Sequence, residues 1–543
     1  MTGSFVQIHY HNRPGGVTSV MGQYGLAFGK ACGSAAGTSL VVCAKHHARA
    51  DIDGAKVIDV RECGYTTFRT KNAFIKTRNS LLKRLEQIIT SGLLARPISV
   101  VGHNLTLGKN CALSSAFAQC ARRLAKQKNE YRFFSVVHDF AEEGRTDLMS
   151  QIVSLKRLGI KIRDELYPVS PNLCFVALNN RNYSILKKAG FQVRLVPNPV
   201  SAPATARSMP ASIRIRVIRG LAKCAEKDNT AFKPDAPLLV YPSRIISRKN
   251  PVEAILLAHF FFSSNLLLGE SGTSIEDRAL AVHLKRLCTR CKIPVIFNSG
   301  RAASFLLSHD ETLLSLLTKA ADVCITTSVL EGFGYALYEP WLYHKAVVGR
   351  VPAGSDVQKK IAAAGLYSKL LIPCGWIDVD KLVRRYYRDM KKSCRAIDEF
   401  PDTGSFSKQF NSAFVENRGI DFGCLDIATQ CAVLECLCRH PELTDEWKRA
   451  FPYQTKALMD SWKAATVRPP PFAGRNRKRV ISLFGNSAFA ASFSACFEKI
   501  LLADARVRPG VAALRKRLCS LDTFRQLTTP QFPLQGHYCT IFA

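Results

Sequence analysis

The strongest constraint on the fold is a regular alternation of short apolar segments with longer segments of helical periodicity. Phe5–Tyr10 is an apolar strand, and a helical pattern follows from about Thr18 to Cys32. Strands are also expected at 39–44, 55–60, 98–102, 133–137, 174–177 and 192–196. Strands that alternate with helices form a largely parallel sheet covered by helices. The first 200 or so residues therefore predict an α/β domain.

The chain is long enough for more than one such domain. It has 543 residues, of which 47% are hydrophobic and 22% charged, and a chain of this kind holds about two to four domains. Residues 201–237 are rich in Ala, Ser, Pro and basic residues, which is typical of a connection. A new strand follows at Pro237–Ser243. We expect domains at 1–205 and 237–375, an interdomain connection at 206–236, and a helical C-terminal extension at 376–543.

The net charge favours anionic partners without choosing among them. The sequence has 76 basic and 42 acidic residues, a formal net charge of +34, so nucleic acid, acidic lipid and nucleotide donors are all compatible. No nucleic-acid-binding motif is present and the basic residues are spread along the chain, so no specific nucleic acid is expected. The N-terminus has no basic and apolar signal pattern, and the 19 scattered cysteines suit a reducing compartment. We expect a cytoplasmic protein.

Polar residues follow several expected strands of the first domain. Gly15 and Gly16 stand between the first strand and the first helix, an order that suits a diphosphate but also an ordinary turn. His138 directly follows a strand that ends at Val137, and ligands of open α/β sheets bind outside such strand ends. His103 occupies a similar position. The residues alone leave open which histidine faces a ligand, or whether each is a satisfied core residue.

The second domain has a basic pair after its first strand. Arg244 and Lys249 lie five residues apart on a loop that enters a helix. Cationic side chains at such a position suit the diphosphate of a leaving group. A solvated basic loop is the alternative interpretation.

Two carboxylates follow a later strand of the same domain. Glu331 and Glu339 lie eight residues apart around a turn that should open a helix, so Glu339 returns to the face of Glu331 after about two helical turns. Gly332 and Gly334 allow close approach of the backbone, and the amides from Gly332 through Phe333 to the helix start can face a diphosphate. This arrangement indicates a nucleotide-sugar site.

Taken together, these motifs resemble the family 4 retaining glycosyltransferases of GT-B fold, over about residues 1–370. The resemblance implies two Rossmann-like domains that face each other across a cleft, the first on the acceptor side and the second binding the donor. It also implies roles for the site residues. Arg244 and Lys249 match the diphosphate-binding pair, Glu331 the glutamate that faces the donor sugar, Glu339 the ribose-binding glutamate, Gly16 the glycine-loop contact, and His138 the histidine near the sugar.

The resemblance further implies the reaction and its partners. A sugar would pass from a nucleoside-diphosphate sugar to a carbohydrate, lipid-linked or other hydroxyl acceptor with retention of configuration. We expect no metal and no cofactor besides the donor substrate, because Arg244, Lys249 and backbone amides can stabilise the leaving diphosphate.

The extension has two periodic segments. Basic residues recur at helical spacing from Lys381 to Arg395, which would suit peripheral contact with anionic lipid on the inner membrane face or a solvated helix face. Phe489, Phe493, Phe497 and Leu501 recur every four residues and predict a docking stripe. The stretch 480–497 is interrupted by polar residues, and we do not expect it to span a membrane.

Two alternatives stay open. One is a GT-B enzyme of different chemistry, such as a sugar-nucleotide epimerase or a phosphorylase. The other is a basic adaptor that binds nucleic acid or membrane on a GT-B fold. Release of nucleoside diphosphate that depends on an acceptor would separate the transferase from both.

Overall fold

The computed structural model describes residues 3–13, 15–33, 36–45, 52, 55–127, 129–143, 145–201, 209–272, 274–299, 312–362, 365–393, 401–468, 470–498, 510–521, 524 and 538–541. Contacts divide the chain into two compact units. Unit 1 comprises Met1–Ser201, Lys391–Phe400 and Ile481–Ser520. Unit 2 comprises Ala202–Met390, Pro401–Val480 and Leu521–Ala543.

Unit 1 is built on a seven-stranded sheet in the order β3-β2-β1-β4-β5-β6-β7, in which all neighbouring strands are parallel. Its strands are β1 (Gly3–His11), β2 (Ala36–Ala44), β3 (Lys56–Asp59), β4 (Ile98–His103), β5 (Tyr131–Val137), β6 (Leu173–Ala177) and β7 (Val193–Leu195). The strand order reverses between β1 and β4, as in Rossmann-like domains. The expected α/β domain is confirmed.

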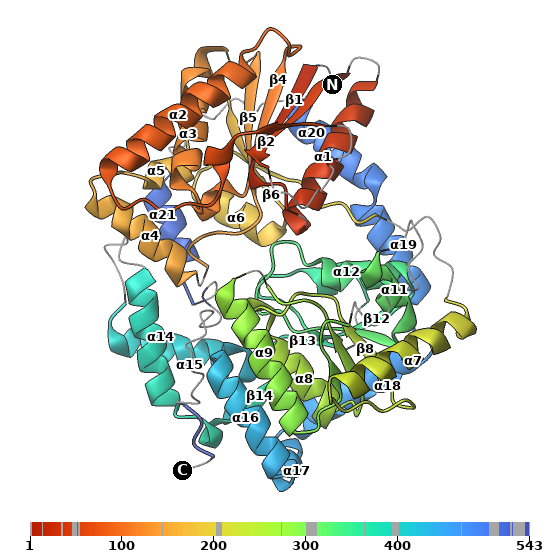
Figure 1. Ribbon diagram of the computed structural model, residues 1–543. Coiled ribbons are helices and arrows are strands. Elements are labelled where there is room, and N and C mark those ends of the chain that lie inside the picture. The colour runs from red at the N-terminus through yellow and green to blue at the C-terminus, as the bar shows by residue number, and fades with distance from the viewer. Residues whose placement is uncertain are drawn as a thin grey trace. The chain divides into compact units, whose positions relative to one another are not determined.

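Helices cover both faces of this sheet, as Figure 1 shows for α1 and α20 on one side and α2 and α3 on the other. They are α1 (Gly16–Cys32), α2 (Lys71–Ile89), α3 (Cys111–Arg123), α4 (Thr146–Arg157), α5 (Arg163–Leu166), α6 (Asn180–Lys188), α20 (Asn486–Glu498) and α21 (Val511–Leu518). Polar side chains begin several of them. Thr70 caps α2 by accepting from the amide of Ala73, and Asn110 caps α3.

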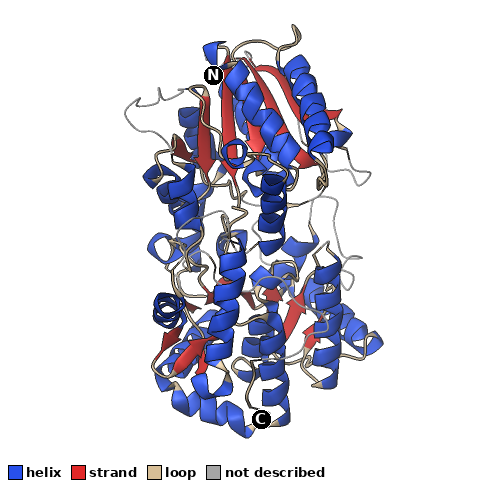
Figure 2. Ribbon diagram, turned by 90° about the vertical axis from the view of Figure 1, so that its left-hand side faces the viewer, coloured by secondary structure: helices blue, strands red, loops and turns tan. Residues whose placement is uncertain are grey.

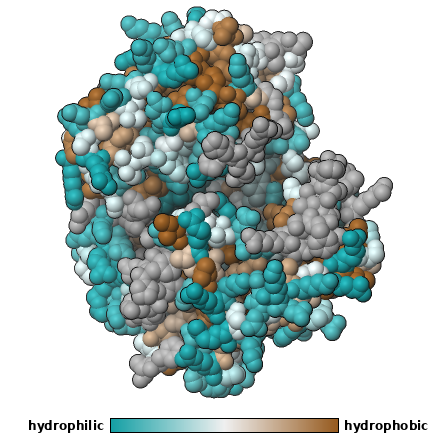
Figure 3. Space-filling view, viewed as in Figure 1, coloured by the Kyte–Doolittle hydropathy of each residue, from teal (hydrophilic) through white to brown (hydrophobic). Residues whose placement is uncertain are grey.

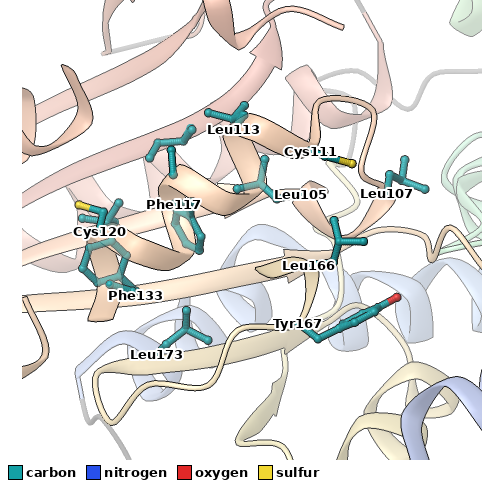
Figure 4. Packing of buried hydrophobic residues seen from close by; sticks show 14 of the residues in the cluster. Leu105, Leu107, Cys111, Leu113, Phe117, Cys120, Phe133, Leu166, Tyr167 and Leu173 are labelled. Atoms are coloured by element: carbon teal, nitrogen blue, oxygen red, sulfur yellow. The ribbon is translucent and has the colours of Figure 1, made fainter. Parts of the chain in front are cut away.

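The core of unit 1 lies between the sheet and the helices on the α2–α3 face. Figure 4 shows Phe117 of α3 near Phe133 of β5, and their ring centroids are 5.5 Å apart. Leu514 and Leu518 of α21 belong to the same cluster of buried residues. A helix from near the chain's end therefore completes a core that the first 200 residues begin.

The opposite face of the sheet is covered in part by α20. The ring of Phe493 lies 5.8 Å from that of Phe5 in β1 and 5.4 Å from that of Tyr24 in α1, measured between centroids. Phe497 stacks on Phe493 at 4.2 Å. The expected docking stripe is confirmed for three of its members, Phe489 included, and Leu501 lies outside the described residues.

One helical stretch among the described residues, Ala473–Phe497, is long and apolar enough to cross a membrane by length and composition. Part of it, 39% of its most apolar window, is buried within the protein. The aromatic side of α20 is already occupied by β1 and α1.

Unit 2 contains a second parallel sheet, in the order β10-β9-β8-β11-β12-β13. Its strands are β8 (Leu238–Tyr241), β9 (Asn265–Leu268), β10 (Val295–Ile296), β11 (Val323–Thr326), β12 (Ala346–Arg350) and β13 (Leu366–Tyr367). The order reverses between β8 and β11, so this unit is also Rossmann-like. Its helices are α7 (Ala211–Lys227), α8 (Pro251–Phe260), α9 (Ile275–Arg290), α11 (Leu313–Ala320), α12 (Tyr335–Leu342) and α13 (Val357–Lys360). In Figure 2 the strands of each unit lie among helices.

A small antiparallel sheet extends unit 2. It has the order β14-β16-β15, formed by β14 (Leu371–Pro373), β15 (Val415–Glu416) and β16 (Gly419–Asp421). Arg350 at the end of β12 is buried and lies 2.8 Å from Glu253 of α8 and 2.6 Å from Asp421 of β16, measured between Nη2 and the carboxylate oxygens. This ion-paired cluster joins the parallel sheet to the small sheet.

The described residues of the predicted extension, 376–543, lie mainly in helices, with β15 and β16 among them, and they are divided between the two units. Its helices are α14 (Val379–Ser393), α15 (Thr403–Phe414), α16 (Ile427–Arg439), α17 (Glu442–Ala450), α18 (Pro452–Thr466), α19 (Ala473–Phe484), α20 and α21. The basic segment forms α14, in which Tyr386 is buried against Phe410 and Phe414 while Arg384 and Arg388 are exposed. Arg395 lies outside the described residues. On the face in Figure 3, hydrophilic residues are spread between smaller hydrophobic groups.

The aromatic contacts of α20 predict a specific loss of stability. Replacing the buried Phe493 with Ala removes most of a ring from a packed cluster and should cost unit 1 about 3–5 kcal/mol. Hydrogen exchange of the β1 amides measures this cost. The matched variant Leu93→Ala truncates an 87% exposed side chain of the same unit and should cost about 0.5 kcal/mol or less. Equal effects of the two variants would contradict the packing of α20 on β1.

Candidate functional site

In each unit the expected site residues follow strands at the point where the strand order reverses, except His138, which follows β5, the strand next to β4. At such a point two neighbouring strands send their connections to opposite faces of the sheet, and the ends of the strands leave a crevice for ligands. In unit 1 this point lies between β1 and β4, and in unit 2 between β8 and β11.

Gly15 and Gly16 form the turn from β1 into α1. Space is open around both, because a Cβ atom added at either would meet no atom within 4 Å. The backbone of Gly15 is extended, and no described side chain caps the helix. The first amides of α1 are therefore accessible to an anion. The two glycines are not required by packing within the protein itself.

His138 directly follows β5, and its ring lies beside that of His103 at the end of β4. The side-chain nitrogens Nε2 of His138 and Nδ1 of His103 are 3.5 Å apart. His9 of β1 completes the group, with Nδ1 at 2.9 Å from the carbonyl oxygen of His103. All three residues are buried.

A chain of hydrogen bonds assigns the protons of two of these rings. The side-chain nitrogen Nε2 of Gln7 donates to the carbonyl of Met21 at 3.0 Å. The side-chain oxygen Oε1 of Gln7 therefore faces Nε2 of His103, at 2.9 Å. Nε2 of His103 must then donate, and Nδ1 of the neutral ring is an acceptor. His138 consequently carries its proton on Nε2, directed at His103. Nδ1 of His138 is left as a hydrogen-bond acceptor.

The histidines are neutral because they are buried. Burial lowers the pKa of His9 to about 3 and the pKa of His138 to about 4, and it holds the pKa of His103 well below its usual range. Of the two histidines that the sequence left in competition, His103 has both ring nitrogens engaged. His138 keeps one ring nitrogen, Nδ1, without a hydrogen-bond partner among the described residues.

The loop after His138 is held by carboxylates. Glu142 accepts from the hydroxyl of Tyr167 at 2.6 Å and from Nε of Arg515 at 3.1 Å. Glu143 accepts from Nη1 of Arg181 at 2.6 Å. These contacts fix the backbone that carries His138.

In unit 2 the basic loop after β8 is a short turn whose backbone is tied down from two strands. Ser247–Lys249 form one turn of 3-10 helix. Its last carbonyl, that of Lys249, accepts from the hydroxyl of Tyr241 at the end of β8. The carbonyl of the next residue, Asn250, accepts at 2.7 Å from the hydroxyl of Thr327, which follows β11. Neighbouring strand ends therefore position the turn.

The turn brings Lys249 to Glu331. Their side chains form an ion pair, and Nη1 of Arg248 lies 3.7 Å from the other carboxylate oxygen of Glu331. Burial raises the pKa of Glu331, but the charges of Lys249 and Arg248 outweigh it and leave that pKa below its usual range. Glu331 is therefore ionised at neutral pH.

Arg248 was not among the residues expected from the sequence. Its Nη1 donates to the carbonyl of Leu330 at 3.2 Å, and its own carbonyl accepts from the amide of Val329 at 3.1 Å. The available signal was its place beside Lys249 in the same turn. Arg244 is different, because it is exposed and the structure does not bring it to Glu331.

The turn after Glu331 opens α12. Gly334 has φ +87°, a left-handed conformation that favours glycine, and it immediately precedes the helix. Phe333 lies against Tyr335 and Tyr338, with ring centroids 5.0 and 5.2 Å apart. Gly332 precedes it in the same turn. No described side chain caps the start of α12.

Glu339 lies on the second turn of α12 and is partly buried. Burial raises the pKa of its carboxyl group to about 7. Among the described residues, none forms a hydrogen bond or ion pair with this carboxyl group. It is a partly buried carboxyl group on the helix that the turn after Glu331 opens.

Among the described residues there is no group of three or more His, Cys, Asp or Glu side chains that could hold a metal ion. The chemistry of the described site is that of cations, amides and carboxylates.

Two Rossmann-like domains are the domain pair of the GT-B class of folds. Solved structures similar to this chain include two synthases and one glycosyltransferase. Sucrose-phosphate synthase from Thermosynechococcus elongatus is 12% identical in sequence. The match covers 91% of this chain and 98% of that structure's chain, with a TM-score of 0.48. The catalytic domain of starch synthase IV from Arabidopsis thaliana is 11% identical over 88% and 100%, with a TM-score of 0.44. WaaG, a glycosyltransferase involved in lipopolysaccharide biosynthesis, is 13% identical over 85% and 98%, with a TM-score of 0.43.

One curated protein gives a more specific similarity. Mannosylglucosyl-3-phosphoglycerate synthase from Petrotoga mobilis is 24% identical over 340 residues, which are 62% of this chain and 62% of that protein. The chain thus matches about three fifths of the length of this relative. No protein-family model matches the chain.

The neutral histidines predict how unit 1 responds to acid. An unfolded histidine has a pKa of about 6.5, so below that pH the unfolded chain binds more protons than the folded one, and stability falls as the pH falls. His138→Gln should reduce the stability lost between pH 7 and pH 5 by about 2 kcal/mol, read from hydrogen exchange of the β4 and β5 amides. An unaltered loss in His138→Gln would show that this ring is not neutral in the folded protein.

Proposed function

We propose that this protein is a glycosyltransferase that moves a sugar from a nucleoside-diphosphate sugar to an acceptor hydroxyl with retention of configuration. The observation that carries the proposal is the pairing of Lys249 with Glu331 at the strand reversal of unit 2. An ionised carboxylate for sugar hydroxyls and a cation for phosphate stand side by side there, next to the uncapped start of α12.

The donor diphosphate would lie between the basic turn and α12. Lys249 and Arg248 supply positive charge, and the amides from Gly332 to Tyr335 supply hydrogen-bond donors. Arg244, which is exposed on the same loop, would reach the diphosphate from the solvent side. The nucleoside diphosphate gains negative charge as its bond to the anomeric carbon breaks, and these groups stabilise that charge. Lys249 and Arg248 thereby act where a metal ion acts in other transferases.

Glu331 would hold the donor sugar. Its carboxylate is ionised and can accept only, so it suits two sugar hydroxyls. Because Glu331 and the diphosphate share Lys249, donor binding would realign the lysine toward phosphate and free carboxylate oxygens for the sugar. The acceptor hydroxyl then attacks the anomeric carbon on the face that the diphosphate leaves, and its proton passes to a phosphate oxygen.

Glu339 would bind the ribose. Ribose hydroxyls are donors, and the carboxylate of Glu339 has no other partner among the described residues. In unit 1, Nδ1 of His138 is an acceptor for a sugar hydroxyl, and the open turn at Gly15 and Gly16 admits a phosphate. These roles agree with those that the family resemblance implies.

The curated relative supports the class of reaction. By name it is a synthase of a mannosylglucosyl-phosphoglycerate, a product that contains sugars joined to an anionic group. For this chain, with its net charge of +34, we propose an acceptor that carries a hydroxyl on an acidic molecule. The acceptor-dependent release of nucleoside diphosphate, followed in a coupled assay, tests the proposal. Release without acceptor would favour an epimerase or another GT-B chemistry, and no nucleotide affinity at all would favour an adaptor.

The Lys249–Glu331 pair predicts opposite effects on binding and on transfer. Lys249→Met removes a charged hydrogen bond to the diphosphate, worth about 1.5–3 kcal/mol, and should weaken binding of UDP, GDP or ADP by about 10- to 100-fold in calorimetry. Glu331→Gln removes a competitor for the lysine, so it should leave nucleotide affinity equal or higher while slowing sugar transfer.

A lysine on the surface of the same unit provides the control for the change of charge in Lys249→Met. Lys456 forms an exposed ion pair with Asp460 in the same unit, and Lys456→Met changes the net charge by the same amount as Lys249→Met. It should leave nucleotide affinity unchanged. If both lysine variants weaken binding alike, the nucleotide responds to overall charge and the proposed diphosphate site is wrong.

Glu339 predicts a pH dependence of donor binding. Ribose hydroxyls bond best to the ionised carboxylate. Because the carboxyl group has a pKa of about 7 in the free protein, it is mostly protonated at lower pH and must lose its proton before it binds the ribose. Nucleotide affinity should therefore rise by about tenfold from pH 6 to pH 8. Glu339→Gln cannot ionise, and its affinity should follow only the titration of the nucleotide phosphate. Parallel profiles for the two proteins would remove Glu339 from the site.

A further inference from the structure

Unit 1 contains a cavity that the proposed reaction does not use. It has a volume of about 500 Å³, a size typical of sites for small molecules. It lies between the second half of α4, the residues that lead into α5, and the start of α21. Figure 1 shows these three helices together on the same side of unit 1.

The walls of the cavity combine apolar and cationic side chains. Ile152 and Ile162 are buried in its lining, and Val511 is half-buried. Lys156, Lys161, Arg163 and Arg515 also line it, against the single carboxylate of Asp164. A ligand with an apolar body and a negative group matches both features.

Arg515 lines this cavity and has hydrogen-bond donors without a partner among the described residues. Its side chain is fully buried, and Nε donates to Glu142 at 3.1 Å. Its two other nitrogens, Nη1 and Nη2, are buried and have no hydrogen-bond partner among the described residues. A buried guanidinium with two unsatisfied amino groups is costly, and an oxyanion can accept from both at once.

We propose that the cavity between α4, α5 and α21 is a second binding site, for a small molecule that carries a phosphate or carboxylate on an apolar body. The anionic group would accept from Nη1 and Nη2 of Arg515, with Lys156, Lys161 and Arg163 around it. The apolar body would pack on Ile152, Ile162 and Val511. This site is separate from the nucleotide-sugar site proposed above and does not depend on it.

Occupation of the site would affect the loop that carries His138. Glu142 belongs to that loop and bonds to both Arg515 and Tyr167. A ligand that holds the guanidinium in place also holds this carboxylate in place. Binding should therefore slow hydrogen exchange in residues 138–143.

The test uses the full-length protein and calorimetry with four probes. Octyl phosphate and octanoate carry the anion on an apolar chain, octan-1-ol lacks the charge, and inorganic phosphate lacks the chain. We expect saturable binding of one or both amphiphilic anions, and binding at least tenfold weaker for octan-1-ol and for inorganic phosphate. Equal binding of octan-1-ol would overturn the anionic site, and failure of both amphiphilic anions to bind would overturn the site altogether.

Variants with matched controls locate the binding. Ala512 lines the cavity and Ala513 does not, although both are exposed on α21, so Ala512→Trp should abolish binding and Ala513→Trp should preserve it. Lys156→Ala should weaken binding severalfold, while Arg157→Ala, on the same helix but outside the cavity, should not. Binding that is the same in both members of each pair places the probe elsewhere and contradicts the proposal.

The role of Arg515 requires a variant that folds. Arg515→Met alone would leave Glu142 buried without its cation, so the double variant Arg515→Met/Glu142→Gln keeps the interior neutral. It should lose binding of octyl phosphate by at least tenfold while its hydrogen exchange elsewhere in unit 1 stays unchanged. Wild-type protein saturated with nucleoside diphosphate, and Lys249→Met, should bind octyl phosphate as well as free wild-type protein does. Competition with nucleotide would assign the probe to the donor site.

Discussion

The reversal of strand order within each parallel sheet is the constraint on which the candidate site depends. Parallel strands are joined by crossovers, and at the reversal two adjacent crossovers leave in opposite directions. In unit 2 this brings the turn after β8 against the loop after β11, although 82 residues separate Lys249 from Glu331 in the chain. The side chains of Tyr241 and Thr327 then fix the turn itself. The ion pair is a consequence of the topology and not of local sequence.

Burial has different effects on the ionisable side chains of the two units. In unit 1 it removes the charge of three neighbouring histidines, and hydrogen bonds from Gln7 onward decide where their protons lie. In unit 2 it is opposed by cations, so Glu331 stays ionised, whereas Glu339 lacks a cation and its pKa moves toward neutrality. Two carboxylates on one turn and one helix thus differ in charge near pH 7, because only one of them has basic neighbours.

The sequence predicted the elements better than the contacts between them. Apolar runs predicted all seven strands of the sheet in unit 1, but in unit 2 they predicted only β8 and the strand before Glu331, β11. The four-residue spacing of Phe489, Phe493 and Phe497 predicted a docking helix. The partners of that helix, in β1 and α1, could not be read from spacing, because they are nearly the whole chain away. Arg248 was missed for a related reason: its contact with Glu331 depends on the 3-10 turn, which a basic dipeptide does not reveal. Arg515 lies in a segment without a motif. Its interest comes from its contact with Glu142, which only the folded structure shows.

The packing of α20 against β1 also constrains synthesis of the protein. The ribosome releases β1 to β7 long before it reaches Phe489, and at usual elongation rates the interval is on the order of tens of seconds. During that time Phe5 and Tyr24 lack the rings that cover them in the finished protein. The nascent first domain must therefore remain incomplete, with part of an aromatic surface uncovered, until about nine tenths of the chain has been made and α20 emerges. A chaperone that recognises exposed aromatic surface would find its substrate in that interval and lose it when α20 docks.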